Sequence, residues 1–167
     1  MPGDQVIRQE HGDAQSSPDR VEDPAALLAL SDEALVEQVQ RTTFRFFWEG
    51  AHPHSGLAPD RRTRREGPVD DLVAIGGSGF GAMALIVAVE RGWVSREAAA
   101  GRLERMLDAL CRAERYHGAF PHFMNGCSGN TVPFIEKDDG GDLVETALLM
   151  QGLLCVREYF DRDDPGE

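Results

Sequence analysis

Long apolar runs, lysines and cysteines are all scarce in this sequence. The longest apolar stretch, at 80–89, falls short of the roughly 18 residues that a membrane-spanning helix needs. There is a single lysine, Lys137, and there are three cysteines, Cys111, Cys127 and Cys155. This odd and widely spaced set excludes a disulfide framework and a CxxC metal site, so a reducing compartment is expected.

Positive charge is also in short supply. The 17 basic residues are outnumbered by 29 acidic ones, which gives a net charge of −12. Because binding to nucleic acid needs a basic surface, this balance excludes a nucleic-acid partner. Residues 1–20 show no basic segment followed by an apolar one, so no signal peptide is predicted and a cytoplasmic location is the default expectation.

The 167 residues suit a single domain, and their periodicity predicts an all-α fold. Residues 1–30 are polar and are expected to form a disordered tail, and 162–167 form an acidic end. Between them, in the domain at 31–161, four helices are predicted, near 31–49, 78–91, 95–116 and 142–160. No run alternates as a strand would.

Two of the predicted helices have informative apolar patterns. The helix at 78–91 has no polar face, so it should be buried on every side, which four helices can hardly achieve. It is joined to the next helix through Gly92 and Trp93 as an αα-hairpin. In the last helix, the predicted core face carries Leu143, Ala147, Met150, Leu154 and Cys155.

Four short motifs follow one another along the chain. They are GLAPDR at 56–61, GFG at 79–81 with AVERGW at 88–93, GAFPHF at 118–123, and ETALL at 145–149 with REYF at 157–160. Together they resemble the glycoamylase-like bacterial family, which includes endo-β-1,2-glucanases and a module of cyclic β-1,2-glucan synthases.

The resemblance implies an (α/α)6 toroid whose loops form a glycan cleft at one end. The chain holds only the helices expected for the first third of such a toroid. It is therefore interpreted as the N-terminal part of a β-glucan hydrolase, and β-1,2-glucan is the favoured substrate. Three alternatives stay open: a non-catalytic glycan-binding module, an oligomerising helical module that self-associates through exposed apolar faces, and a piece of a glucan-synthesising enzyme. No cofactor and no membrane partner are predicted.

The candidate catalytic residues are Asp142 and Glu145, where a long loop at 117–141 meets the last helix. Glycoside hydrolysis needs a proton donor and a base or nucleophile, usually two carboxyl groups. The resemblance also implies an acidic residue at Glu145. The competing interpretation is helix capping, since Asp-x-x-Glu is typical of a helix start.

The spacing of this pair limits its role. Side chains three residues apart on a helix have Cβ atoms about 5–6 Å apart. An inverting pair, which the resemblance implies, has its carboxyl groups about 6.5–9.5 Å apart. A further catalytic group is therefore expected elsewhere. Glu136, Asp138 and Asp139 are interpreted as a solvated acidic run.

Five residues are candidates for sugar binding. Asp60 and Arg61 could bind hydroxyl groups, or could form a local ion pair. Phe120, His122 and Phe123 could form a platform for a pyranose ring, or could pack beneath the long loop as a small core.

Metal and nucleophile sites are not predicted. His52 and His54 have no carboxylate or cysteine at ligand spacing. Cys127 would need an activating histidine, which the sequence does not specify. The glycines at 76–81 follow no strand pattern and precede no lysine, so they indicate close helix packing and not a phosphate loop.

Overall fold

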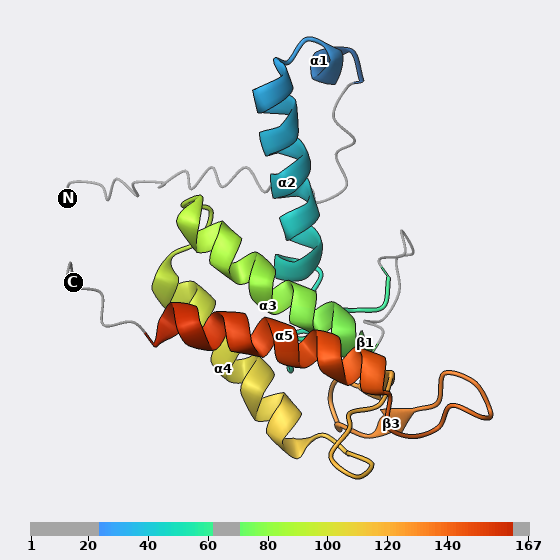
Figure 1. The fold of residues 1–167 in the computed structure, drawn as a ribbon. Helices are drawn as coiled ribbons and strands as arrows, with labels where there is room; N and C mark the ends of the chain where they lie inside the picture. Colours follow the sequence, from blue (N-terminus) through green and yellow to red (C-terminus); the bar gives the residue numbers. More distant parts are fainter. Residues whose placement is uncertain (1–23, 62–70, 162–167) are drawn as a thin grey trace, which may run out of the picture. The chain divides into compact units, whose positions relative to one another are not determined.

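The computed structural model describes residues 24–61 and 71–161, and helices make up most of it (Figure 1). In order along the chain the elements are α1 (Pro24–Leu28), α2 (Asp32–Trp48), β1 (Leu72–Ala74), α3 (Ile75–Glu90), α4 (Arg96–Arg112), β2 (Phe123–Asn125), β3 (Thr131–Val132) and α5 (Leu143–Phe160). The predicted all-α class is confirmed. Within these ranges no helix has the length and apolarity needed to cross a membrane.

The chain divides into two compact units, 1–37 and 38–167. In the first, the hydroxyl of Ser31 accepts a hydrogen bond from the Ala34 N–H at 3.3 Å, so Ser31 caps α2 as predicted. The short helix α1 lies within the segment 1–30 that was assigned to a tail. Residues 1–23 and 162–167 lie outside the described ranges.

The second unit is centred on α3 and α5, whose backbones lie in contact. A Cβ added to Gly79 would overlap the carbonyl of Leu148 and come within 2.7 Å of the Leu149 Cα, and one added to Gly152 would overlap Gly79. Two helices can approach this closely only where side chains are missing. The interpretation of the α3 glycines as a close-packing surface is therefore confirmed.

The hairpin between α3 and α4 is built as the sequence predicts. Gly92 has φ of 67°, and the Trp93 N–H donates to the Ala88 carbonyl at 2.8 Å. Ser95 caps α4 by accepting from the Ala98 N–H at 3.1 Å. α4 ends at Arg112, four residues before its predicted end.

A small antiparallel sheet, in the order β1-β2-β3, was not predicted. Val73 lies opposite Met124, and Met124 opposite Thr131. The strands have three, three and two residues, which is too short for an alternating pattern to be recognised. Since β1 leads directly into α3, the sheet fixes where that helix begins.

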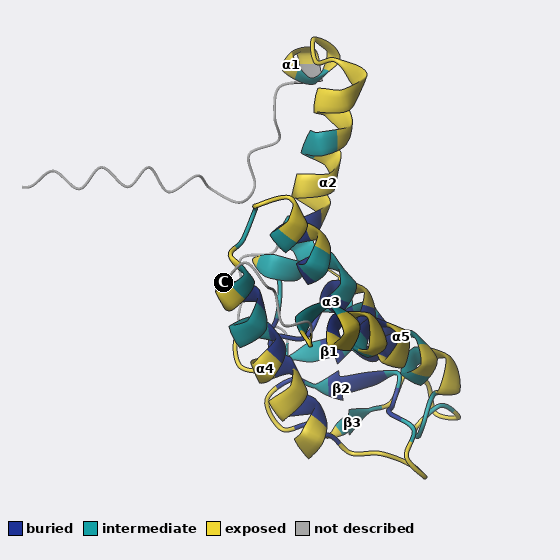
Figure 2. Ribbon diagram, turned by 60° about the vertical axis from the view of Figure 1, so that its left-hand side comes forward, coloured by how far each residue is buried: buried dark blue, intermediate teal, exposed yellow. Residues whose placement is uncertain are grey.

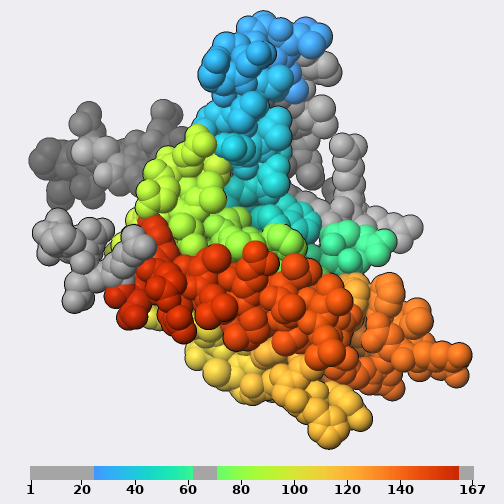
Figure 3. Space-filling model, in the orientation of Figure 1, coloured from blue at the N-terminus to red at the C-terminus, as the bar shows by residue number. Residues whose placement is uncertain are grey.

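The predicted core face of α5 is wrong. Leu143, Met150 and Leu154 are 77%, 43% and 49% exposed, while the buried residues are Leu149, Gly152 and Val156. Both sides of α5 are apolar, so apolar periodicity could not identify the side that meets α3. In the space-filling view α5 crosses one face of the unit, beside α3 (Figure 3).

α3 is likewise not buried on every side. Phe80 and Val87 are both about half exposed, seven residues apart on one side of the helix. α4 is amphipathic, so residues that are buried on one of its sides alternate along the ribbon with exposed residues on the other (Figure 2). The described part of the chain therefore covers α3 with α5 and α4 but leaves an apolar stripe open.

Candidate functional site

Three of the four motifs meet α3 at its first residues. The Ala74 N–H donates to the Ala58 carbonyl at 3.0 Å, and the Ile75 N–H donates to the His122 carbonyl at 3.2 Å. The Gly76 N–H donates to Glu145 Oε2 at 2.7 Å. The first residues of α3 thus gather the GLAPDR segment, the loop before β2 and the start of α5.

Glu145 binds across to this helix end. The residue before α3, Ala74, has no side chain that could cap the helix, so the carboxylate of Glu145 supplies the acceptor instead. A negative charge is also favourable there because it faces the positive end of the helix dipole. A Cβ at Gly76 would lie 2.7 Å from Oε2, so glycine makes the contact possible.

Asp142 uses both of its carboxylate oxygens. Oδ1 accepts from the N–H groups of Val144 and Glu145, at 2.8 and 3.0 Å, and so caps α5. Oδ2 lies 3.0 Å from His122 Nδ1. The hydrogen bond from the Glu145 N–H, together with His122, lowers the pKa of Asp142. The predicted capping role is confirmed, and the lowered pKa makes Asp142 a poor proton donor.

An aromatic surface adjoins Asp142. The rings of His122 and Phe134 are stacked, with centroids 4.5 Å apart and planes 10° apart, and the edge of Phe123 packs on His122 at 4.4 Å. Phe134 is 52% exposed, whereas Phe123 is buried. The exposed aromatic residue at this place is Phe134, which was not among the predicted sugar-binding residues. The feature of the sequence that could have indicated Phe134 is its position in a long loop that is rich in aromatic residues.

Phe120 has the core surroundings that were one of its two predicted alternatives, whereas Asp138 differs from its prediction. Phe120 is buried in the hydrophobic core, with its backbone N–H bonded to Thr146 Oγ1 at 2.8 Å. Asp138 is half-buried, and its carboxylate lies within 4.8 Å of the ligand atoms of His122 and Asp142. Asp138 therefore belongs to this cluster and is not simply part of a solvated acidic run.

Asp60 and Arg61 form the local ion pair that the sequence left open. Arg61 Nε lies 2.6 Å from Asp60 Oδ2, and the arginine side chain is mostly exposed. Pro59 bridges to Val73, so this segment runs along the outer side of β1. Sugar binding by the pair stays a prediction.

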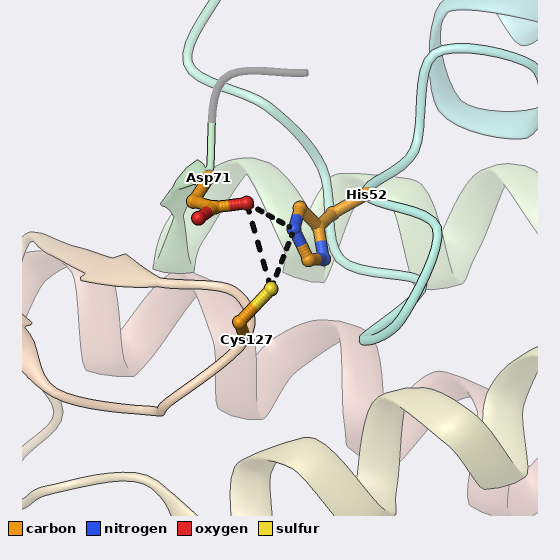
Figure 4. Close-up of side chains that lie close together, drawn as sticks. All are labelled: His52, Asp71 and Cys127. Carbon is orange, nitrogen blue, oxygen red and sulfur yellow. Dashed lines mark hydrogen bonds and ion pairs between the residues drawn. The ribbon is translucent and has the colours of Figure 1, made fainter. Parts of the chain in front are cut away.

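His52, Asp71 and Cys127 form a second cluster, separate from the first (Figure 4). His52 Nε2 lies 3.1 Å from Asp71 Oδ1 and 3.7 Å from Cys127 Sγ, and the thiol lies 3.5 Å from Asp71 Oδ1. The hydrogen bond with His52 lowers the pKa of Asp71. Partial removal from water, then the bond to Asp71, raises the pKa of Cys127.

This geometry is not that of a nucleophilic triad. In a triad the nucleophile and the carboxylate contact opposite nitrogens of the imidazole. Here both contact Nε2, while Nδ1 faces Ser55. The structure therefore supplies the histidine that the sequence could not specify beside Cys127, but not in a position that activates a thiol.

Comparison with known proteins finds relatives that are named as β-1,2-glucan hydrolases, although no family model matches the chain. It is 44% identical over 144 residues to an exo β-1,2-glucooligosaccharide sophorohydrolase (non-reducing end) of Parabacteroides distasonis. These residues are 86% of this chain but 19% of that protein.

Solved structures give the same result. An endo-β-1,2-glucanase of Chitinophaga pinensis, in complex with sophorotriose and glucose, matches 82% of this chain with a TM-score of 0.77 and 46% identity. A β-1,2-glucanase of P. distasonis matches 81% with a TM-score of 0.71 and 45% identity. The chain spans 34% and 19% of these two structures. The chain is therefore homologous to a segment of these helical-toroid β-1,2-glucan hydrolases, and its resemblance to the glycoamylase-like family is confirmed over that segment.

Proposed function

We propose that this chain is part of a glycoside hydrolase acting on β-1,2-glucan and that the start of α5 contributes to its glycan-binding face. The observation that carries the proposal is the cluster of Asp142, Glu145 and His122 beside the exposed ring of Phe134. Relatives with 44–46% identity that are named for β-1,2-glucan substrates support the substrate class.

The carboxylates are assigned different roles within this proposal. Asp142 is ionised at neutral pH, and its lowered pKa keeps it so in acid as well, so it orients His122 and holds the helix start. Glu145 is the group proposed to act on the glycosidic bond, as donor or base. The second carboxyl group of a hydrolase pair would come from the part of the relatives that this chain does not span.

The sugar contacts are proposed to come from the His122–Phe134 stack. Its exposed face is flat and apolar, which suits the C–H face of a pyranose, while Asp138 offers an acceptor for hydroxyl groups nearby. Asp60 and Arg61 are proposed as further polar contacts from the GLAPDR segment.

The experiment is hydrolysis of β-1,2-glucan by this chain and by a form extended to the length of its relatives. Release of oligosaccharides is measured by chromatography. Glu145→Gln is expected to lower the rate by about 10²–10⁴-fold, the usual contribution of a general acid or base. Glu136→Gln, an exposed change in the loop before α5, is the control. Full activity in Glu145→Gln would refute its role.

Glycan binding without cleavage is the second candidate, favoured by the share of the relatives that the chain spans. Titration with β-1,2-glucooligosaccharides by calorimetry tests it. Phe134→Ala should weaken binding by about 0.5–1.5 kcal/mol, as expected for a lost aromatic contact. Ile135→Ala removes the neighbouring exposed apolar side chain and serves as the control. Equal affinities of the two variants would contradict the platform.

We also propose that the chain self-associates through the apolar sides of α3 and α5. The support is the pair of uncovered stripes described above, with Leu143, Met150 and Leu154 on one helix and Phe80 and Val87 on the other. Large apolar side chains left exposed along one side of a helix are typical of interaction sites when they form a patch.

A further inference from the structure

The cluster of His52, Asp71 and Cys127 lies outside the proposed glycan site. We propose that these three side chains bind a single divalent cation of the zinc class, through Nε2, a carboxylate oxygen and Sγ. Imidazole nitrogen, carboxylate oxygen and thiolate sulfur are the three ligand types that zinc takes in proteins. The fourth position of the tetrahedron is left to solvent on the open side of the cluster.

The distances between the three donor atoms fit a tetrahedral ion. Bond lengths of about 2.0–2.3 Å and tetrahedral angles place the donors about 3.3 Å apart for N and O, about 3.6 Å for N and S, and about 3.5 Å for O and S. The corresponding distances in the structure are 3.1, 3.7 and 3.5 Å. Figure 4 shows the three side chains directed toward one another from separate segments. Each distance is thus within about 0.2 Å of the value for zinc.

The backbone holds the three ligands in register. The Gly126 N–H donates to the Asp71 carbonyl at 2.7 Å, which ties the residue before β1 to the turn that carries Cys127. Gly126 also lies against the His52 ring, since a Cβ there would be 2.7 Å from two of the ring atoms. Asn125 Oδ1 accepts from the Cys127 N–H at 3.0 Å and fixes the turn. A site whose ligand side chains are already held in place binds a metal more tightly than one whose ligands must first move.

His52 has the neighbour that a ligating histidine needs. Its side chain is 1% exposed, and its second nitrogen, Nδ1, lies 3.1 Å from Ser55 Oγ. In the structure Nδ1 also accepts from the Ser55 backbone N–H at 3.3 Å. When Nε2 binds a metal, Nδ1 carries the proton, so this backbone contact gives way and Nδ1 donates to the hydroxyl instead. Ser55 is itself buried, so the orientation of the ring is fixed from both sides.

The consequence of binding is a link between three segments. His52 comes from the loop after α2, Asp71 from the residue before β1, and Cys127 from the turn between β2 and β3. Asp71 is 19 residues from His52, and Cys127 is 75 residues from it, so the bound ion would close two long loops. The bound ion would therefore fix the sheet at the start of α3.

The test is titration of the chelator-treated protein with Co²⁺, a spectroscopic probe for zinc sites. We expect one equivalent to bind, with the charge-transfer band of a thiolate–cobalt bond and the visible bands of a tetrahedral ion. Zn²⁺ should displace it and raise the Tm. Cys127→Ser should abolish the charge-transfer band, and Asp71→Asn should weaken Co²⁺ binding more than about 10-fold.

The controls are Cys111→Ser and Cys155→Ser, which remove the other two exposed thiols. Both should bind Co²⁺ like the unmodified chain, and circular dichroism should show that every variant is folded. Absence of stoichiometric Co²⁺ binding would overturn the proposal. So would a thiolate–cobalt band that persists in Cys127→Ser, or binding that is insensitive to Asp71→Asn.

Discussion

At the scale of the residue, the side chains at the start of α5 close helix ends as well as facing the candidate site. Asp142 caps its own helix, and Glu145 caps α3. Substitutions at these positions therefore combine a structural effect with any catalytic one. Stability has to be measured beside activity for each of them.

Replacement of Asp142 separates capping from charge. Asp142→Ala should cost about 0.5–2 kcal/mol of unfolding free energy at pH 7, the usual value for a lost cap. Asp142→Asn should cost less, because asparagine also caps helices well. Urea denaturation measures both. A cost for asparagine equal to that for alanine would contradict this account.

The effect of Asp142→Asn on stability should also depend on pH. The pKa of Asp142 is lowered in the folded chain, so its ionised form stabilises the fold above the unfolded-state pKa of about 3.9. That contribution is lost as the pH falls through the lower, folded-state pKa. The stability difference between Asp142→Asn and the unmodified chain should therefore shrink below about pH 4. Asp108→Asn, an exposed change on α4, is the control and should show no such convergence.

How far the sequence predicts these roles depends on the separation of the partners. The Asp142 cap is contained in four consecutive residues, so its pattern could be recognised. The partner of Glu145 is Gly76, 69 residues away, and nothing local indicates it. His52, Asp71 and Cys127 are brought together only by the sheet, which was itself not predicted.

At the scale of the element, the contact of α3 with α5 decides the packing of the second unit. Glycine normally costs a helix about 0.5–1 kcal/mol relative to alanine, yet α3 contains four near its start. Contact with α5 offsets that cost, so that α3 can begin directly after β1, at Ile75, three residues before the predicted start. Propensity alone could not show this.

Gly79→Ala should destabilise the chain by about 1–3 kcal/mol, because the methyl group would overlap the α5 backbone. Gly101→Ala is the matched control, since a Cβ at that α4 position meets no atom within 4 Å. It should stabilise the chain by about 0.4–1 kcal/mol. Chemical denaturation measures both. The account fails if the two alanine variants change stability in the same direction.

The helices were easier to predict than their faces. Caps at Ser31, Ser95 and Asp142 are local signals, and all three are present. The buried side of α5 is a tertiary property, and Leu143 and Leu149 look alike in the sequence although one is 77% exposed and the other buried. Apolar periodicity identifies a face only when the opposite face is polar.

At the scale of the whole molecule, the feature that matters for behaviour in solution is the pair of apolar sides on α3 and α5 that the described residues leave uncovered. This chain spans 34% and 19% of two of the solved relatives. The part of each relative that it does not span is therefore about two and about four times as long as the matched part. Homologous helices in a longer chain have further structure available to cover them. Studied by itself, this chain presents those apolar sides to water or to a second copy.

We therefore expect the sedimentation coefficient of the purified chain to rise with concentration. Met150→Gln combined with Leu154→Gln should reduce that rise, because both residues lie on the exposed stripe of α5 and association buries apolar surface. Gln151→Asn, which keeps an exposed position on the same helix polar and uncharged, is the control. If the double variant associates as strongly as the unmodified chain, the α5 stripe is not the interface. If the unmodified chain stays monomeric at every concentration, the self-association proposal is wrong. The glycan-binding proposal is then untouched, because none of the residues on which it rests belongs to the exposed stripe of α5.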